Sequence, residues 1–175
     1  HPCQILADVF TFIEERGQIK NKLITWIGDI NNVCFSWIEA AKILGFKLNI
    51  SCPPEYKDNI DKIRNVDINF RFYDDPVEAC CNADLITTDV WTSMGFENET
   101  EVRKEKFEKW RVDEEKMNRA ADNVLFMHCL PAHRGEEVSS VVIDGPNSVV
   151  WKEAENRLHV QKALMEFLLL KYEVS

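Results

Sequence analysis

The chain contains 175 residues, so the usual domain size of roughly 100 to 200 residues predicts a single domain or most of one. Hydrophobic residues make up 45% and charged residues 29%, which is typical of a globular protein and argues against intrinsic disorder. The formal net charge of −9 has the wrong sign for wrapping nucleic acid or an anionic membrane surface, so a bound anion needs a local site.

Apolar and amphipathic segments alternate along the chain, which is typical of βαβ units and a mostly parallel sheet. A first helix is expected over residues 2–16, where apolar residues recur at helical spacing and Pro2 suits the first helical position. Strands are expected at 23–27, 46–51, 68–72, 85–88 and 124–127, with 148–150 as a sixth strand or an extended connection. Further helices are expected at 32–44, 54–64, 76–82, 101–110 and 114–121.

The last helix is expected over residues 152–171. Its apolar stripe should dock on the sheet and consists of Val160, Ala163, Leu164, Phe167 and Leu168. The charge run 97–109 indicates a solvated loop and helix. The predicted fold is therefore a doubly wound α/β unit of Rossmann type, with a mostly parallel sheet of about five strands and helices on both faces.

The cysteines and the ends of the chain bear on the compartment. Six cysteines are scattered through predicted strands and helices, which indicates free thiols in a reducing, cytoplasmic compartment. The longest apolar stretches, such as 167–170, are far shorter than the ~20 residues of a membrane-spanning helix. The chain begins at His1 without a methionine or an apolar leader, so we expect a fragment.

Ligands of open parallel sheets bind beyond the carboxyl ends of the strands, which selects three loops here. The first loop, 28–32, lacks the second and third glycines of a dinucleotide fingerprint, which argues against a nicotinamide cofactor. Asn31 and Asn32 could cap the following helix, orient a zwitterionic substrate through donor and acceptor groups, or do both.

The second loop begins at Asp89, directly after an apolar strand. Its carboxylate could pair with an ammonium group at the rim of the sheet, or it could form an N-cap or Asx-turn. Ser93, Met94 and Gly95 form a small, flexible stretch suited to a lid over a ligand.

The third loop, 128–132, leaves several alternatives open. His128, Cys129 and His133 could bind zinc, but no second Cys/His cluster stands at metal spacing, which argues against a metal site. Cys129 could instead form a nucleophile pair with a histidine, contact a substrate while Leu130 and Pro131 fix the loop, or be an inert buried thiol.

Two cationic or titratable groups near the helix ends remain. Arg157 could be a solvated surface group or could clamp a phosphate or carbonyl oxygen in a bidentate manner. His1 could be a frayed end or a donor that polarises a carbonyl, and Gln4 would project from the same helical face.

Taken together, these segments resemble the second, amino-acid-binding domain of the ornithine carbamoyltransferases. The resemblance is carried by five motifs in family order: HPCQILAD at 1–8, WIGD at 26–29 with Asn31 and Asn32, DVWTSMG at 89–95, HCLP at 128–131 running into RGEEV at 134–138, and EAENR at 153–157. It spans essentially the whole chain, and the SMG and HCLP segments favour ornithine over aspartate as the acceptor.

The resemblance implies a role for each candidate residue. Carbamoyl phosphate would be contacted by His1, Gln4, Cys129, Leu130 and Arg157. Ornithine would be contacted by Asn32, Asp89, Ser93 and Met94, with Cys129 near the attacking amine. The catalytic residues would be Cys129, His1 and Asp89, and no metal or organic cofactor is required.

The resemblance also implies what this chain lacks. The family's Ser-Thr-Arg-Thr phosphate-binding segment is missing, and it belongs to a first domain that would precede His1. Residues 2–16 would form the interdomain helix, the intact enzyme would be a homotrimer or a multiple of it, and the 175-residue chain alone would be inactive. The alternatives are a carbamoyltransferase for another amine such as putrescine, a non-catalytic binding module of this fold and, last, a Rossmann oxidoreductase.

Overall fold

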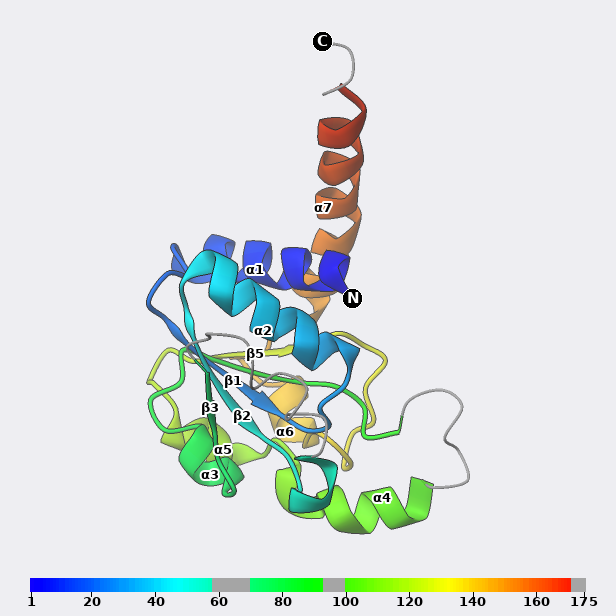
Figure 1. Cartoon of the computed structure of the whole chain (residues 1–175). Coiled ribbons are helices and arrows are strands. Elements are labelled where there is room, and N and C mark those ends of the chain that lie inside the picture. Colours follow the sequence, from blue (N-terminus) through cyan, green and yellow to red (C-terminus); the bar gives the residue numbers. More distant parts are fainter. Residues whose placement is uncertain (58–69, 93–99, 171–175) are drawn as a thin grey trace.

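The computed structural model describes residues 1–57, 70–92 and 100–170. Its centre is a parallel five-stranded sheet in the order β3-β2-β1-β4-β5 (Figure 1), which confirms the predicted α/β class. The strands are β1 (Leu23–Ile27), β2 (Lys47–Ser51), β3 (Phe70–Phe72), β4 (Leu85–Thr88) and β5 (Leu125–His128). All agree with the expected strands to within one residue, except that residues 68–69 of the third lie outside the described residues.

The expected strand at 148–150 is an extended connection instead. Only Ser148 forms a bridge, an isolated one to Phe126, and the final helix begins immediately afterwards at Val150. The helix expected at 54–64 is described only as far as a 3-10 turn over residues 54–57, and its remainder lies outside the described residues.

The helices divide between the two faces of the sheet (Figure 1). On one face lie α1 (Pro2–Arg16) and α2 (Asn32–Leu44), and on the other lie α3 (Pro76–Ala79), α5 (Glu114–Arg119) and α6 (Ser140–Ile143), the last of which the apolar pattern had not predicted. Helix α4 (Thr100–Phe107) continues into the 3-10 helix η3 (Glu108–Trp110). Strand residues alternate between the two cores, as Trp26 and Ile27 do, because successive side chains of a strand point to opposite faces.

The last helix, α7 (Val150–Leu170), corrects one expectation. Only its first turns are buried, at Val150, Glu153 and Asn156. The stripe expected to dock on the sheet is half-buried at Val160 and Leu164, and its distal part is exposed, with Phe167 at 61% and Leu168 at 50% exposure. The C-terminal half of α7 projects away from the body of the domain (Figure 1), so helical periodicity identified the helix but not its partner.

Strand register determines which loops meet. Thr88 pairs with His128 at the carboxyl ends of β4 and β5, and Ile27 pairs with Ser51 at the ends of β1 and β2. The loops after β1, β4 and β5 therefore leave the sheet side by side at one edge. No described helix is both long enough and apolar enough to cross a membrane.

Candidate functional site

The loop after β1 approaches β4 closely because Gly28 carries no side chain. Its φ of +135° is a conformation that L side chains rarely adopt, and a Cβ there would lie 3.3 Å from Thr88 Oγ1. The Thr88 hydroxyl donates a 2.6 Å hydrogen bond to the carbonyl of Ile27. These contacts bring the loop that carries the two asparagines beside the loop that begins at Asp89.

Asn31, rather than Asn32, connects these two loops. Its Oδ1 accepts from the backbone N–H groups of Val33 and Cys34 at 2.9 and 3.1 Å, so it is the N-cap of α2 as the sequence allowed. Its Nδ2 donates to Asp89 Oδ2 at 2.7 Å. Asn32, which the family resemblance had selected, is exposed at the first position of α2.

Asp89 also binds the third loop. The Cys129 thiol donates to Asp89 Oδ1 at 3.1 Å, and the same oxygen accepts from the backbone N–H of Val90 at 2.8 Å. Burial raises the pKa of the Cys129 thiol above its usual range, and the neighbouring Asp89 carboxylate raises it further. A protonated thiol therefore faces a carboxylate, and the Cys-His pairing considered from the sequence does not form.

The ring of His128 is turned away from Cys129 and shapes the loop instead. Nδ1 accepts a 2.9 Å hydrogen bond from the backbone N–H of Leu130, so Nε2 carries the proton and donates to Glu137 Oε1 at 3.1 Å. Glu137 is fully buried and also accepts from the His133 backbone N–H at 2.6 Å. Sequence reasoning missed Glu137 as a site residue, although a charged residue within the RGEEV motif was the available signal.

The zinc cluster considered from the sequence does not assemble, because the ring of His128 and the thiol of Cys129 have other partners. A different group, His133, Glu136 and Glu137, places potential ligand atoms within 4.8 Å of one another. Lys104 Nζ already lies 3.0 Å from Glu136 Oε1. Lys104 therefore already supplies a cation to this group of potential metal ligands.

Gln4, on α1, is the centre of a second set of contacts. Its side chain is buried, Nε2 donates to Asp8 Oδ1 at 2.7 Å and to Glu153 Oε1 at 2.9 Å, and Oε1 accepts from Arg157 Nη1. Glu153 Oε2 accepts from the backbone N–H of His128 at 3.0 Å. Three of the residues expected at carbamoyl phosphate, namely Gln4, Arg157 and Cys129, thus belong to one connected region where α1, α7 and β5 meet.

The other expected residues lie outside this network. His1 is exposed at the N-cap of α1 and caps the helix with no side-chain hydrogen bond. Leu130 is half-buried with a φ of +49°. Ser93 and Met94, together with the lid expected there, lie outside the described residues.

Arg103 corrects the expectation that the charge run 97–109 is solvated. Only 8% of Arg103 is exposed, and its Nε donates to the Trp91 carbonyl while its Nη2 pairs with the carboxylate of Asp29. The guanidinium therefore ties the loop after β4 to the loop after β1. Charge composition gave no signal of this, because a buried arginine is identified by its partners and not by its sequence neighbours.

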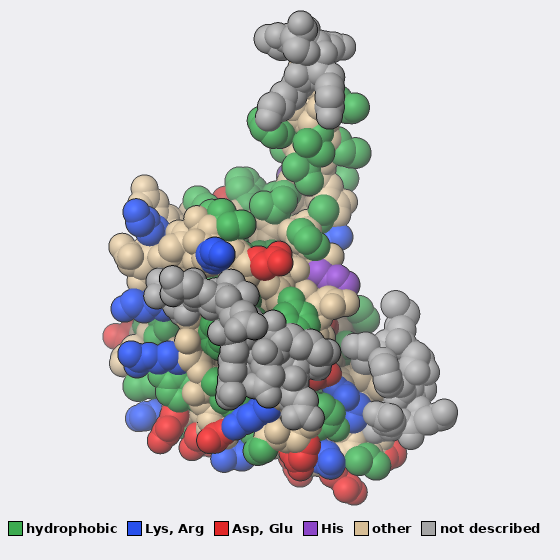
Figure 2. Space-filling model, viewed as in Figure 1, with side chains coloured by type: hydrophobic (Ala, Val, Ile, Leu, Met, Phe, Trp, Pro, Cys, Tyr) green, Lys and Arg blue, Asp and Glu red, His purple; other side chains and the backbone are tan. Residues whose placement is uncertain are grey.

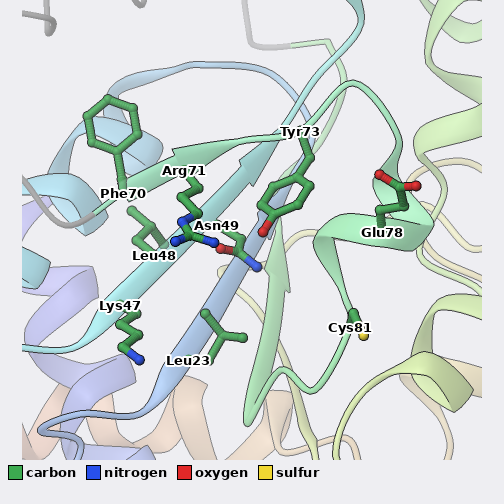
Figure 3. Close-up of a pocket in the computed structure, with 9 residues that line it drawn as sticks. All are labelled: Leu23, Lys47, Leu48, Asn49, Phe70, Arg71, Tyr73, Glu78 and Cys81. Carbon is green, nitrogen blue, oxygen red and sulfur yellow. The ribbon is translucent and has the colours of Figure 1, made fainter.

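A separate hollow of about 490 Å³ lies away from the carboxyl edge of the sheet, near the starts of β1 and β2 (Figure 3). Asn49, Arg71 and Tyr73 line it together with the first residues of those strands. None of the residues predicted for the site lines this hollow. The candidate site is thus the convergence of loops at the carboxyl edge rather than this hollow.

Comparisons with known proteins identify the family of this chain. Residues 20–168 match the family model described as the aspartate/ornithine carbamoyltransferase Asp/Orn binding domain. The chain is 63% identical over 171 residues to an ornithine carbamoyltransferase of Burkholderia mallei, covering 97% of this chain and 55% of that protein. A relative of the same description in Azoarcus sp. is 61% identical over the same shares.

Solved structures give the same picture. The ornithine carbamoyltransferase of Burkholderia thailandensis superimposes with a TM-score of 0.86 at 56% identity, over 97% of this chain and 55% of that chain. That of Pyrococcus furiosus gives a TM-score of 0.85 at 45% identity, over 94% and 55%. The chain therefore spans about half the length of the relatives it matches, and the resemblance stated from the sequence is confirmed.

Proposed function

The chain belongs to the aspartate/ornithine carbamoyltransferase family, whose Asp/Orn binding domain is matched by residues 20–168, and from that premise we propose the function of the full-length protein. It transfers the carbamoyl group of carbamoyl phosphate to the δ-amino group of L-ornithine, giving citrulline and phosphate. The observation that carries this proposal is the junction of Asn31, Asp89 and Cys129 beside the Gln4–Arg157 pair. One half suits an amine and the other suits a phosphorylated donor.

The amine half is polar but holds no cation among the described residues. Within that part of the chain, Asp89 is bonded to neutral donors, namely the Asn31 amide, the Val90 N–H and the Cys129 thiol. The Asp89 carboxylate can therefore attract the amine of the acceptor. This amine must lose a proton before it attacks the carbamoyl carbon. Ser93, Met94 and the exposed Asn32 complete the proposed ornithine site by family resemblance.

The donor half offers cationic and hydrogen-bonding groups. Arg157 presents a planar fork of donors that suits phosphate or carbonyl oxygens, and Gln4 holds it in place. His1 projects one helical turn before Gln4 and makes no side-chain capping bond, so it can reach a carbonyl oxygen. Leu130 contributes the loop backbone beside these groups. No metal or organic cofactor enters this proposal.

The rest of the enzyme is proposed to pack on the apolar side of α1, α2 and α7. Exposed hydrophobic side chains gather along the projecting half of α7 and over the neighbouring helices (Figure 2). A shallow groove of about 220 Å³ between α1 and α2 is lined by Leu6, Val9 and Ile43 among others. An exposed apolar surface of this kind marks an interaction site, and the matched relatives are about twice as long as this chain.

Three consequences belong to the proposal. The chain alone is inactive, because a phosphate-binding segment that the family supplies from its other domain is missing from these 175 residues. The intact enzyme is a homotrimer or a multiple of it. Its compartment is the cytoplasm, which the six free cysteines support.

The test is formation of a ureido product from carbamoyl phosphate by the full-length protein, with ornithine, putrescine and aspartate offered in parallel, since specificity is a ratio of rates. Ornithine-dependent product supports the proposal. A preference for putrescine keeps the chemistry and reassigns the acceptor, and ligand binding without any product supports a non-catalytic module. The 175-residue chain assayed alongside should form no product, and citrulline formation by it would contradict the proposed division of the site.

A further inference from the structure

Two carboxylates lie buried together beneath the donor half of the site. Asp8, on α1, and Glu153, in the first turns of α7, are each only 1% exposed. Both accept hydrogen bonds from the same group, Gln4 Nε2, at 2.7 and 2.9 Å. Glu153 also accepts from the backbone N–H of His128, so the pair joins α1, α7 and the end of β5.

The charges around this pair do not balance if both carboxylates are ionised. Among the described residues, Arg157, from α7, is the one cation that acts on Asp8. From α1 the pair receives only the neutral Gln4 amide, and from the end of β5 only the backbone N–H of His128. The Cys129 thiol donates to Asp89 and the His128 ring is bonded to Glu137, so neither group neutralises the pair. Two buried negative charges would thus face a single guanidinium, which is costly in a low-dielectric interior.

We propose that Asp8 and Glu153 share one proton and act as positioning residues that hold the Gln4 amide, and through it Arg157, for the phosphorylated donor. The inference rests on the proposed function and names two residues outside the expected site. The proton lies between the two carboxyl groups, and Arg157 partly neutralises the one negative charge that remains on the pair. Burial raises the pKa of both groups, and Asp8 reaches a pKa of about 7.

A shared proton leaves only one orientation for the Gln4 side chain. Both carboxylates need donors, so Nε2 must face Asp8 and Glu153, and Oε1 must face Arg157. If the proton is lost, the two carboxylates repel each other and draw Arg157 toward themselves. The guanidinium fork is then pulled away from the ligand, and affinity for an anionic donor falls.

Asp8→Asn in the full-length enzyme tests this. The amide that this substitution introduces keeps an acceptor for Gln4 and donates to Glu153, so it replaces the shared proton with an amide hydrogen that cannot be released at these pH values. In the wild type we expect the KM for carbamoyl phosphate at saturating ornithine to rise by about threefold or more between about pH 6.5 and 9, whereas in Asp8→Asn it stays flat. Asp8→Ala, which leaves Gln4 without one acceptor, should raise this KM about tenfold at every pH. The KM for ornithine should change little.

Asp84→Asn is the matched control, because Asp84 accepts from Lys22 and the Leu23 N–H at the opposite edge of the sheet. It should retain the wild-type pH dependence. The proposal would be overturned if the KM for carbamoyl phosphate changed with pH in the same way in the wild type and in Asp8→Asn. It would also be overturned if this KM were unchanged in a folded Asp8→Ala.

A second readout needs no turnover. Infrared spectra of the wild type near neutral pH should contain the carbonyl stretch of a protonated carboxylic acid, and Asp8→Asn should lack it. Absence of this band from the wild type would overturn the shared proton. A wild-type enzyme with the band but without product would instead contradict the proposed function alone.

Discussion

The thiol of Cys129 and the carboxylate of Asp89 meet across two neighbouring strand ends, with 3.1 Å between Sγ and Oδ1. The contact follows from register, because Thr88 and His128 are paired and each functional residue comes one position later. A direct link between the loops after β4 and β5 is therefore built into the sheet. It places a neutral donor and an anionic acceptor where the amine of the substrate is proposed to react.

Replacing Cys129 should lower turnover without unfolding the full-length enzyme. Cys129→Ala removes the donor to Asp89, and we expect kcat to fall by roughly a hundredfold, at the lower end of general acid–base effects. Cys129→Ser retains a donor and should recover part of the loss. Cys81→Ala, at a half-buried cysteine beside the hollow of Figure 3, is the control. An unchanged kcat in Cys129→Ala would contradict a catalytic role for Cys129 and leave it only a role in packing.

Substitutions of the two adjacent asparagines should have different effects, one on stability and the other on ornithine binding. Asn31→Ala removes the cap of α2 and should lower the free energy of unfolding by ~1 kcal/mol. Asn32 is exposed, so Asn32→Ala should leave stability unchanged and raise the KM for ornithine. Urea denaturation and initial rates measure the two effects. The assignment fails if Asn32→Ala destabilises the protein more than Asn31→Ala does.

Arg103→Met should destabilise the site, because it removes the contacts that connect the loop after β1 to the loop after β4. Truncation leaves Asp29 and the Trp91 carbonyl without their partner, and removing one member of a largely buried ion pair costs roughly 3 kcal/mol. The KM for ornithine should rise as well, because the loops after β1 and β4 carry Asn31 and Asp89. Lys106→Met, an exposed neighbour on α4 whose pair with Glu55 spans 4.0 Å, should change neither quantity. Equal effects of the two substitutions would contradict the role given to Arg103.

The buried Asp8 should make stability depend on pH in a specific direction. Its pKa rises from 3.8 to about 7 on folding, so the folded protein retains a proton that the unfolded chain has already released. The stability contributed by this proton is complete below pH 3.8 and is lost as the pH rises through about 7. The wild type should therefore lose stability relative to Asp8→Asn between about pH 4 and 7, measured by urea denaturation. A constant difference across this range would show that Asp8 does not titrate.

The sequence predicted the strands well because they are buried on both faces. Runs such as 23–27 and 85–88 are almost continuously apolar, and their bounds agree with β1 and β4. The short helix α6 was missed because four residues are too few to establish a helical period. The last helix was identified, but its exposed apolar stripe was assigned to the sheet because periodicity reveals a face and not what covers that face.

The site was predicted less completely than the fold. Asp89 and Cys129 were placed on loops at the carboxyl edge because each follows a buried strand, and the structure brings the two side chains into contact. Asp8, Glu137 and Glu153 were not selected, since each lies within a helix or turn where charged residues are ordinarily solvated. Their importance comes from partners far away in sequence, as with Gln4 and Glu153, and local pattern carries no information on such pairs.

Helix α7 makes the site mechanically dependent on whatever holds its distal end. At 1.5 Å per residue, its 21 residues form a rod of about 32 Å, with Glu153 and Arg157 near its base. Among the described residues the buried positions of this rod lie at its base, so it acts as a lever, and a small tilt of the far end rotates the base. Displacement of the exposed end would therefore reach Arg157 and Gln4 through the backbone of a single helix, without any change in the sheet.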